Sequence, residues 1–322
     1  MAPKSGGLIK VLMVVGLVAV LAAIPLLVKS IYFLHIIILV YIYVIAASSL
    51  RTIAISDQLS LGHAGFMGIG AYTSAVLAKQ LGWTPWLTMP LGGVATMVVA
   101  IIVGYPFSRL RTFYFSMVSL FFGMGILAVN TIFSRFTGGY YGLAGIPPLF
   151  TASKVPFYFF FLGLMVLSLL FLYRFESCRI GTSLKAVAQS HEVAASVGID
   201  ESGYRVLALA VGCFIVGLAG AGYAHYNLVL SESSFDLLAS INLMVYMVVG
   251  GIGSFAGPII GAAVLVVVPE MFRGLKMFTP YVFAGIVILT IFLIPQGLVG
   301  LYEKIGFHSK ESPNGGRKSG AA

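Results

Sequence analysis

Charged residues are scarce in this chain of 322 residues, since Asp, Glu, Lys and Arg make up only 9% of it. Soluble domains contain about 25%. Hydrophobic residues account for 59%, and the mean hydropathy is +1.03. A water-soluble fold cannot bury so much apolar surface, so that class is excluded. The lipid bilayer is the relevant solvent, and each helical span across it needs about 20 apolar residues.

Motifs for catalysis and cofactor binding are also missing. No Gly-x-x-x-x-Gly-Lys-Ser/Thr sequence occurs, so nothing in the chain is predicted to hold the phosphates of ATP. The five histidines lack Glu-x-x-His and His-x-x-x-His spacing, which argues against a metal site. Cys178 and Cys213 lack the paired spacing of redox sites. No group of residues combines a nucleophile with a base, as a catalytic site would need. We therefore expect a transport subunit, neither an enzyme nor a cofactor protein, driven by a partner or an ion gradient.

Long apolar runs dominate what is present. They predict an all-α polytopic fold of about ten transmembrane or half-spanning helices. The first run follows Lys4 and Lys10 and lacks a small-x-small cleavage site, so we interpret it as a retained span and not a signal peptide. The runs lie near residues 8–28, 31–50, 62–78, 86–105, 112–133, 155–173, 205–229, 237–252, 255–271 and 279–297.

The distribution of Lys and Arg predicts the orientation. Alternating the sides of the membrane puts 13 of them on the side of both termini and 6 on the other. The positive-inside rule then places both termini in the cytoplasm, and it explains the net charge of +9 without nucleic acid. We predict one permease domain over 1–306, with a cytoplasmic loop at 174–204. A Ser-, Gly- and Lys-rich tail at 307–322 is predicted to be disordered.

Three of the spans, 62–78, 237–252 and 255–271, are short and interrupted by glycine, which predicts half-helices. The first of these spans and the pair at 237–271 show a weak internal similarity between the halves of the chain. Such a similarity is typical of a translocation site between structural repeats. Tight helix packing is the alternative reason for these glycines, and the two interpretations are compatible. Predicted helix breaks are Gly62, Gly65, Gly253 and Gly257, and the predicted pathway lining is Gln58, Ser60, His63, Asn130 and Asn242. A structural hydrogen bond is the commoner explanation for each polar residue alone.

One long polar segment separates the sixth and seventh runs. From Ser183 to Val197, apolar residues recur at spacings of three and four, which predicts one amphipathic helix of about four turns. Thr182 or Ser183 is expected to cap its start, and Gly198 to end it. Its apolar face must contact the membrane surface, the chain's own helix ends or another subunit. The small side chains and single Lys favour another subunit.

Five segments, in order along the chain, resemble the permease subunits of branched-chain amino-acid importers of the ATP-binding-cassette class, the LivM and LivH type. The resemblance implies a heterodimer with a sister permease, two cytoplasmic ATPase subunits and an extracytoplasmic binding protein in a bacterial or archaeal cytoplasmic membrane. It also implies that the amphipathic segment is a coupling helix, with Gly181, Lys185, Glu192, Ala194, Ala195 and Gly198 as the ATPase-coupling residues. The segments are Leu59-Ser60-Leu61-Gly62-His63-Ala64-Gly65-Phe66, Glu192-Val-Ala194-Ala195-Ser-Val-Gly198, Gly217-Leu-Ala-Gly220-Ala-Gly222, Gly250-Gly251-Ile-Gly253 with Gly257-Pro258, and Pro295-Gln-Gly297-Leu298.

One departure from that family pattern precedes the first segment. Where such permeases usually have Asn-Leu-Leu-x-Gly-Tyr-x-Gly, this chain has Arg51-Thr-Ile-Ala-Ile-Ser-Asp57. Charges beside the membrane are normally paired, so we hypothesise that Arg51 and Asp57 interact. The rival function is a gradient-driven carrier or channel for a small polar solute such as an amide or urea. Such carriers commonly hold mid-span carboxylates, and their scarcity here counts against it.

Overall fold

The computed structural model describes residues 15–25, 30–150, 153–272, 274, 279–293 and 297–300. Over these residues, each of the ten predicted apolar runs coincides with a helix. The predicted tail at 307–322, the outer parts of the first run and residues 294–296 of the last lie outside the described residues.

The apolar helices form the main body of the fold. They are a helix over Val15–Pro25 followed by α2 (Ile31–Ala54), α3 (His63–Gln80), α4 (Pro85–Phe107), α5 (Thr112–Ile132), α7 (Lys154–Ser177), α10 (Glu201–Asn227), α11 (Leu237–Gly250), α12 (Gly257–Met271) and α13 (Thr279–Leu293). Short elements connect them: α6 (Ser134–Thr137), η1 (Gly139–Tyr141), β1 (Leu143–Ala144), α8 (Arg179–Gln189), α9 (His191–Ser196), β2 (Val229–Leu230) and η2 (Glu232–Phe235).

Helix lengths separate full spans from shorter segments. Helices α2, α4, α5, α7 and α10 have 21 to 27 residues. At 1.5 Å per residue they extend roughly 30 to 40 Å, enough for a hydrocarbon core of about 30 Å. Helices α11 and α12 have 14 and 15 residues and extend only about 22 Å. The chain is therefore a polytopic helical membrane protein in which some helices stop partway.

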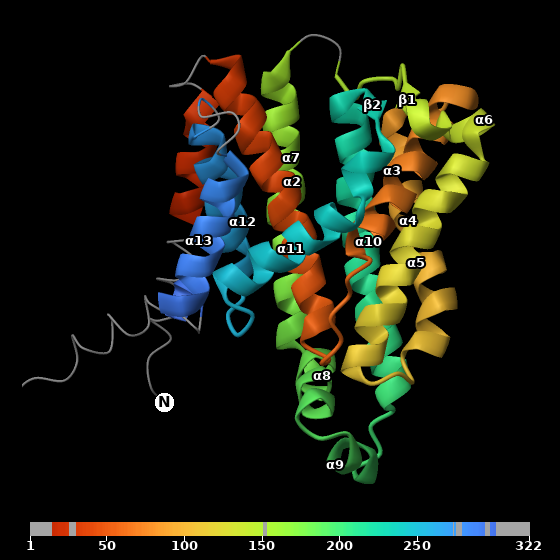
Figure 1. Ribbon diagram of the computed structural model, residues 1–322, viewed down its shortest axis with the longest axis vertical. Coiled ribbons are helices and arrows are strands. Elements are labelled where there is room, and N and C mark those ends of the chain that lie inside the picture. Colours follow the sequence, from red (N-terminus) through yellow and green to blue (C-terminus); the bar gives the residue numbers. More distant parts are fainter. Residues whose placement is uncertain are drawn as a thin grey trace, which may run out of the picture.

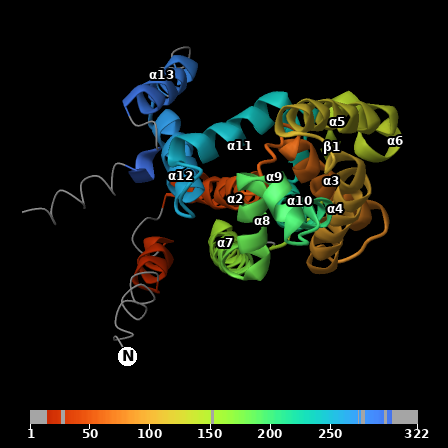
Figure 2. The ribbon, with the colours of Figure 1, turned by 90° about the horizontal axis from the view of Figure 1, so that it is seen from below.

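The long helices lie side by side, and α11 crosses between them at an angle (Figure 1). Helices α8 and α9 project at one end of the bundle, which we call the α8–α9 end. The two-residue strands β1 and β2 pair at the opposite end, with Leu143 facing Leu230 and Ala144 facing Val229. Viewed along the bundle, α11 reaches from the side of α5 to α12, past α2 (Figure 2). The strands β1 and β2 and the short helices α6, η1 and η2 were not predicted from the sequence.

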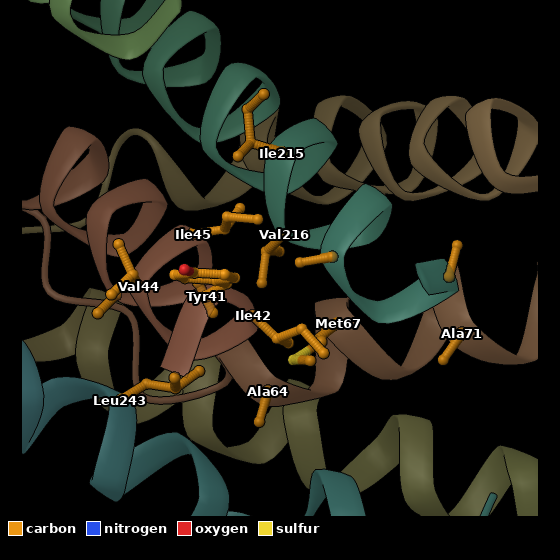
Figure 3. Packing of buried hydrophobic residues seen from close by; sticks show 14 of the residues in the cluster. Tyr41, Ile42, Val44, Ile45, Ala64, Met67, Ala71, Ile215, Val216 and Leu243 are labelled. Atoms are coloured by element: carbon orange, nitrogen blue, oxygen red, sulfur yellow. The ribbon is translucent and has the colours of Figure 1, made fainter. Parts of the chain in front are cut away.

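The core is formed where α2, α3, α10 and α11 meet. Figure 3 shows Tyr41, Ile45, Met67, Val216 and Leu243 turned toward one another from these four helices. Glycine allows the close approach of α3 and α10. A Cβ on Gly70 would lie 2.3 Å from the Gly217 carbonyl oxygen, a distance that real contacts do not reach. Close packing through small residues is the usual way in which membrane helices associate.

Candidate functional site

The chain reverses direction between α2 and α3 without forming helix. Helix α2 ends at Ala54 near the α8–α9 end, Asp57 adopts a left-handed φ of 64°, and α3 begins only at His63. In Figure 1 residues 55–62, which we call the re-entrant segment, run back from that end to mid-height. Non-helical backbone at membrane depth must find hydrogen-bond partners inside the protein. The re-entrant segment was not predicted; only the glycine break at its end was.

One face of α5 supplies these partners. Thr112, Ser116 and Ser119 lie at i, i+4 and i+7, so their side chains share a stripe of the helix. The stripe meets every second residue of the re-entrant segment. Thr112 Oγ1 donates to the Asp57 carboxylate, Ser116 Oγ donates to the Leu59 carbonyl at 2.8 Å, and Ser119 Oγ accepts from the Leu61 amide at 3.0 Å.

Three of the predicted pathway residues lie in or directly after the re-entrant segment. Gln58 and Ser60 are 1% and 0% exposed, and Gln58 Nε2 and Ser60 Oγ have no partner among the described residues. His63 begins α3; its Nε2 lies 2.9 Å from Ser49 Oγ, while its Nδ1 has no described partner. Unpartnered buried polar groups are costly, and these three side chains each contain one that no described residue satisfies.

The remaining two predicted pathway residues lie on different helices. Asn242 is half-buried in α11, two residues after Ser240, whose Oγ accepts from the Ala64 amide at 3.1 Å. The start of α11 thus contacts the start of α3. Asn130 lies near the other end of α5, where its carbonyl accepts from Thr137 Oγ1 at 2.5 Å. The structure therefore does not bring Asn130 to the re-entrant segment.

The predicted helix breaks occupy three kinds of position. Gly62 directly precedes α3, and a Cβ there would lie 2.0 Å from the Ser119 carbonyl oxygen of α5. Gly65 lies inside the first turn of α3 and packs on α5, so it is a packing residue and not a break. Gly253 lies in the turn between α11 and α12, and Gly257 begins α12.

The polar segment folds as two helices, and the prediction of one continuous helix is wrong. Ser190 is extended, with φ of −159° and ψ of 116°, and it separates α8 from α9. Its Oγ accepts from the Val193 amide at 3.4 Å and so caps the new helix. Such local hydroxyl-to-backbone bonds compete with continued helix. Gly198 adopts a φ of 80° after α9, in the left-handed conformation expected of it.

The apolar faces of α8 and α9 have different partners. Leu184 of α8 is buried in a cluster with Phe175 of α7 and Ala208 of α10, so the chain's own helix ends cover that face. On α9 and directly after it, Val193 and Val197 are 63% and 70% exposed. Of the predicted coupling residues, Gly181 and Ala194 are buried, while Lys185, Glu192, Ala195 and Gly198 are exposed.

Arg51 forms a buried ion pair with Glu176, not with Asp57, so the hypothesised Arg51–Asp57 pair is wrong. The side chains of Arg51 and Glu176 are 6% and 7% exposed, and Arg51 Nη1 donates to Glu176 Oε2. Arg51 Nε also donates to the Ile252 carbonyl at 2.9 Å. The Asp57 carboxylate turns instead to Thr112, because the chain reverses between the two charges.

Sequence reasoning missed the residues that hold these segments in place. Ser116, Ser119 and Ser240 lie in apolar helices and looked like ordinary small residues. The one available signal is the spacing of Ser116 and Ser119, three apart on one face of an otherwise apolar span. Glu176 was read as part of the polar segment, 125 residues away from Arg51 in the chain.

Full-length apolar helices combined with shorter ones that stop partway form an architecture that many membrane transporters share. Residues 32–294 match the family of permease components of branched-chain amino acid transport systems, and the chain belongs to that family. The family resemblance stated from the sequence motifs is thereby confirmed.

Individual relatives agree with the family. The chain is 29% identical to the LivM permease protein of the high-affinity branched-chain amino acid transport system of Salmonella typhimurium, over 80% of this chain and 68% of that protein. Identity to Escherichia coli K12 LivM is also 29%, over 81% and 68%. Identity to the LivH permease protein of Escherichia coli K12 is 23%, over 76% and 87%. No solved structure matches the chain.

Proposed function

We propose that this chain is the permease subunit of an ATP-binding-cassette importer that carries branched-chain amino acids across the cytoplasmic membrane. Two partner subunits hydrolyse the ATP, a related permease of the LivH kind completes the pathway, and an extracytoplasmic binding protein delivers the solute. Family membership and the names of the LivM and LivH relatives support the solute and the sister permease. The absence of a phosphate-binding motif from the sequence supports a separate ATPase.

The observation that carries the proposal is the projecting α9 with its uncovered apolar side chains. Helix α8 anchors the element by burying Leu184 against α7 and α10. Val193 and Val197 remain exposed on the part that projects farthest from the bundle. A small apolar surface held out on a short anchored helix fits a groove in another protein. We assign the partner ATPase to this surface and the coupling role to α8 and α9 together.

This assignment makes the α8–α9 end cytoplasmic. At that end of the bundle, Arg109 and Arg111 lie between α4 and α5, Arg174 lies in the last turn of α7, and Arg179 and Lys185 lie in α8. The α8–α9 end therefore carries more Lys and Arg than the opposite end, in agreement with the positive-inside rule. The re-entrant segment then begins on the cytoplasmic side, and we place the solute pathway along Gln58, Ser60 and His63, which lie in it or directly after it.

Purification of the tagged chain from its own cell membranes tests the proposal. We expect an ATPase and a sister permease to co-purify, and leucine uptake into vesicles to require ATP. A Val193→Ser/Val197→Ser double variant removes apolar contact area worth about 1.5 kcal/mol or more, so ATPase affinity should fall about tenfold or more. Val229→Ser is the matched control, because Val229 is 51% exposed at the opposite end.

Two results contradict the proposal. One is leucine uptake by the chain alone, in vesicles without nucleotide or other subunits, which is the behaviour of a carrier or channel. The other is an ATPase that binds the double variant as tightly as the wild type.

A further inference from the structure

The Arg51 side chain joins three parts of the chain at the α8–α9 end. Arg51 belongs to the last turns of α2, Glu176 to the last turn of α7, and Ile252 to the turn between α11 and α12. Besides the two hydrogen bonds described above, the guanidinium lies over the Phe255 ring, 5.7 Å from its centroid. Thr52 Oγ1 also donates to Glu176 Oε1 at 3.4 Å. We call Arg51, Glu176 and the Ile252 carbonyl the Arg51 bridge.

Glu176 is closely tied to the start of α8. Only two residues separate it from Arg179, the first residue of α8. Gly181 packs directly on it, since a Cβ on Gly181 would lie 2.1 Å from the Glu176 carbonyl oxygen. Backbone packing this close leaves no slack, so a displacement of α8 must carry Glu176 with it.

The other side of the Arg51 bridge leads to the re-entrant region. Ile252 follows α11, which is a rigid helix of 14 residues and about 21 Å. Near the far end of α11, Ser240 holds the Ala64 amide at the start of α3. A cavity of about 1000 Å³ lies beside the turn between α11 and α12. Its lining includes Arg51, Glu176, Lys185, Gly251, Ile252 and Phe255.

We propose that Arg51 is a positioning residue that transmits movement of α8 to the α11–α12 turn, and through α11 to the start of α3. This inference rests on the proposed function, because it requires an ATPase that moves α8 and α9. The guanidinium suits the task because its planar fork bonds a carboxylate and a carbonyl at once, which a lysine ammonium on its flexible stem does less well. Variants along such a path of contacts should therefore change the coupling.

Arg51→Lys tests the bridge with little change in charge. In vesicles holding the complex purified through this chain, we expect ATP hydrolysis to continue while leucine uptake per ATP falls about fivefold or more. Arg205→Lys is the matched control. Arg205 is a buried arginine at the same end, but it pairs with Glu201 of α10 and donates to the Ser108 carbonyl after α4 at 3.1 Å, and neither contact involves the α11–α12 turn. The uptake per ATP of this variant should therefore remain that of the wild type.

A second variant separates transmission from folding. Arg51→Met/Glu176→Met removes both buried charges together, and apolar replacement of a buried ion pair is often neutral or stabilising. We expect this complex to assemble and to show the same loss of uptake per ATP, because the bond to Ile252 is gone. The bridge proposal is wrong if either assembled variant keeps the wild-type ratio, or if neither variant assembles. Wild-type uptake without ATP would instead refute the proposed function itself.

Discussion

Replacing Gly62 by Ala is the most direct test of the contact between the re-entrant segment and α5. The new Cβ would lie 2.0 Å from the Ser119 carbonyl oxygen, whereas real Cβ atoms essentially never come closer than 3.0 Å to such an atom, so the two backbones must separate by about 1 Å or more. Overpacking of this kind costs about 2 kcal/mol. The separation also lengthens the bonds from Ser116 and Ser119 to the re-entrant segment, each worth about 1 kcal/mol.

The total loss is about 4 kcal/mol, which for a chain of this length lowers the unfolding midpoint by roughly 8 °C. Circular dichroism of the purified protein during heating in detergent measures it. Gly125→Ala is the matched control on α5, because nothing described lies within 4 Å of its Cβ. There the gain in helix propensity of about 1 kcal/mol should raise the midpoint slightly. A Gly62→Ala midpoint within about 2 °C of the wild type refutes the close contact.

Two further changes probe the same region. Thr112→Val keeps the shape of the side chain but removes the donor to the Asp57 carboxylate, so we expect a loss of about 1.5 kcal/mol in the same heating assay; an unchanged midpoint would show that the bond contributes nothing. Gln58→Leu replaces a buried, unpartnered amide by an apolar side chain, so the protein should stay folded while leucine uptake falls. Asn130→Leu, away from the re-entrant segment, is the control and should transport normally. Equal uptake by both variants would remove Gln58 from the pathway.

The helical fold was predictable because the bilayer imposes it. A run such as Ile31–Ala54 can satisfy its backbone in lipid only as a helix, so length and hydropathy suffice to find it. The short helices α11 and α12 were predictable for the same reason, since their runs are too short and glycines separate them. The pairing of β1 with β2 was not, because two-residue strands carry no periodic pattern.

The contacts of the candidate site were much less predictable. Arg51 was expected to pair with Asp57, the nearest opposite charge in the chain. Its partner instead lies on another helix, because the reversal at Asp57 turns that carboxylate toward α5. The prediction of one continuous helix failed at Ser190 for a local reason. There a side-chain hydroxyl hydrogen bond competes with a helical backbone hydrogen bond, and hydropathy contains no information about either bond.

Buried polar side chains gather where helices are interrupted, and this explains why an apolar protein retains them. Ser116 and Ser119 support the re-entrant segment, Ser240 joins the starts of α11 and α3, and Arg51 holds the turn after α11. Each supplies from a side chain the hydrogen bond that a continuous helix would have formed within itself. A side-chain bond breaks and re-forms more readily than a helical turn unwinds, because helix nucleation is costly. Interruptions held in this way therefore allow segments to shift without exposing backbone to lipid, which is the property that a solute pathway between alternating states requires.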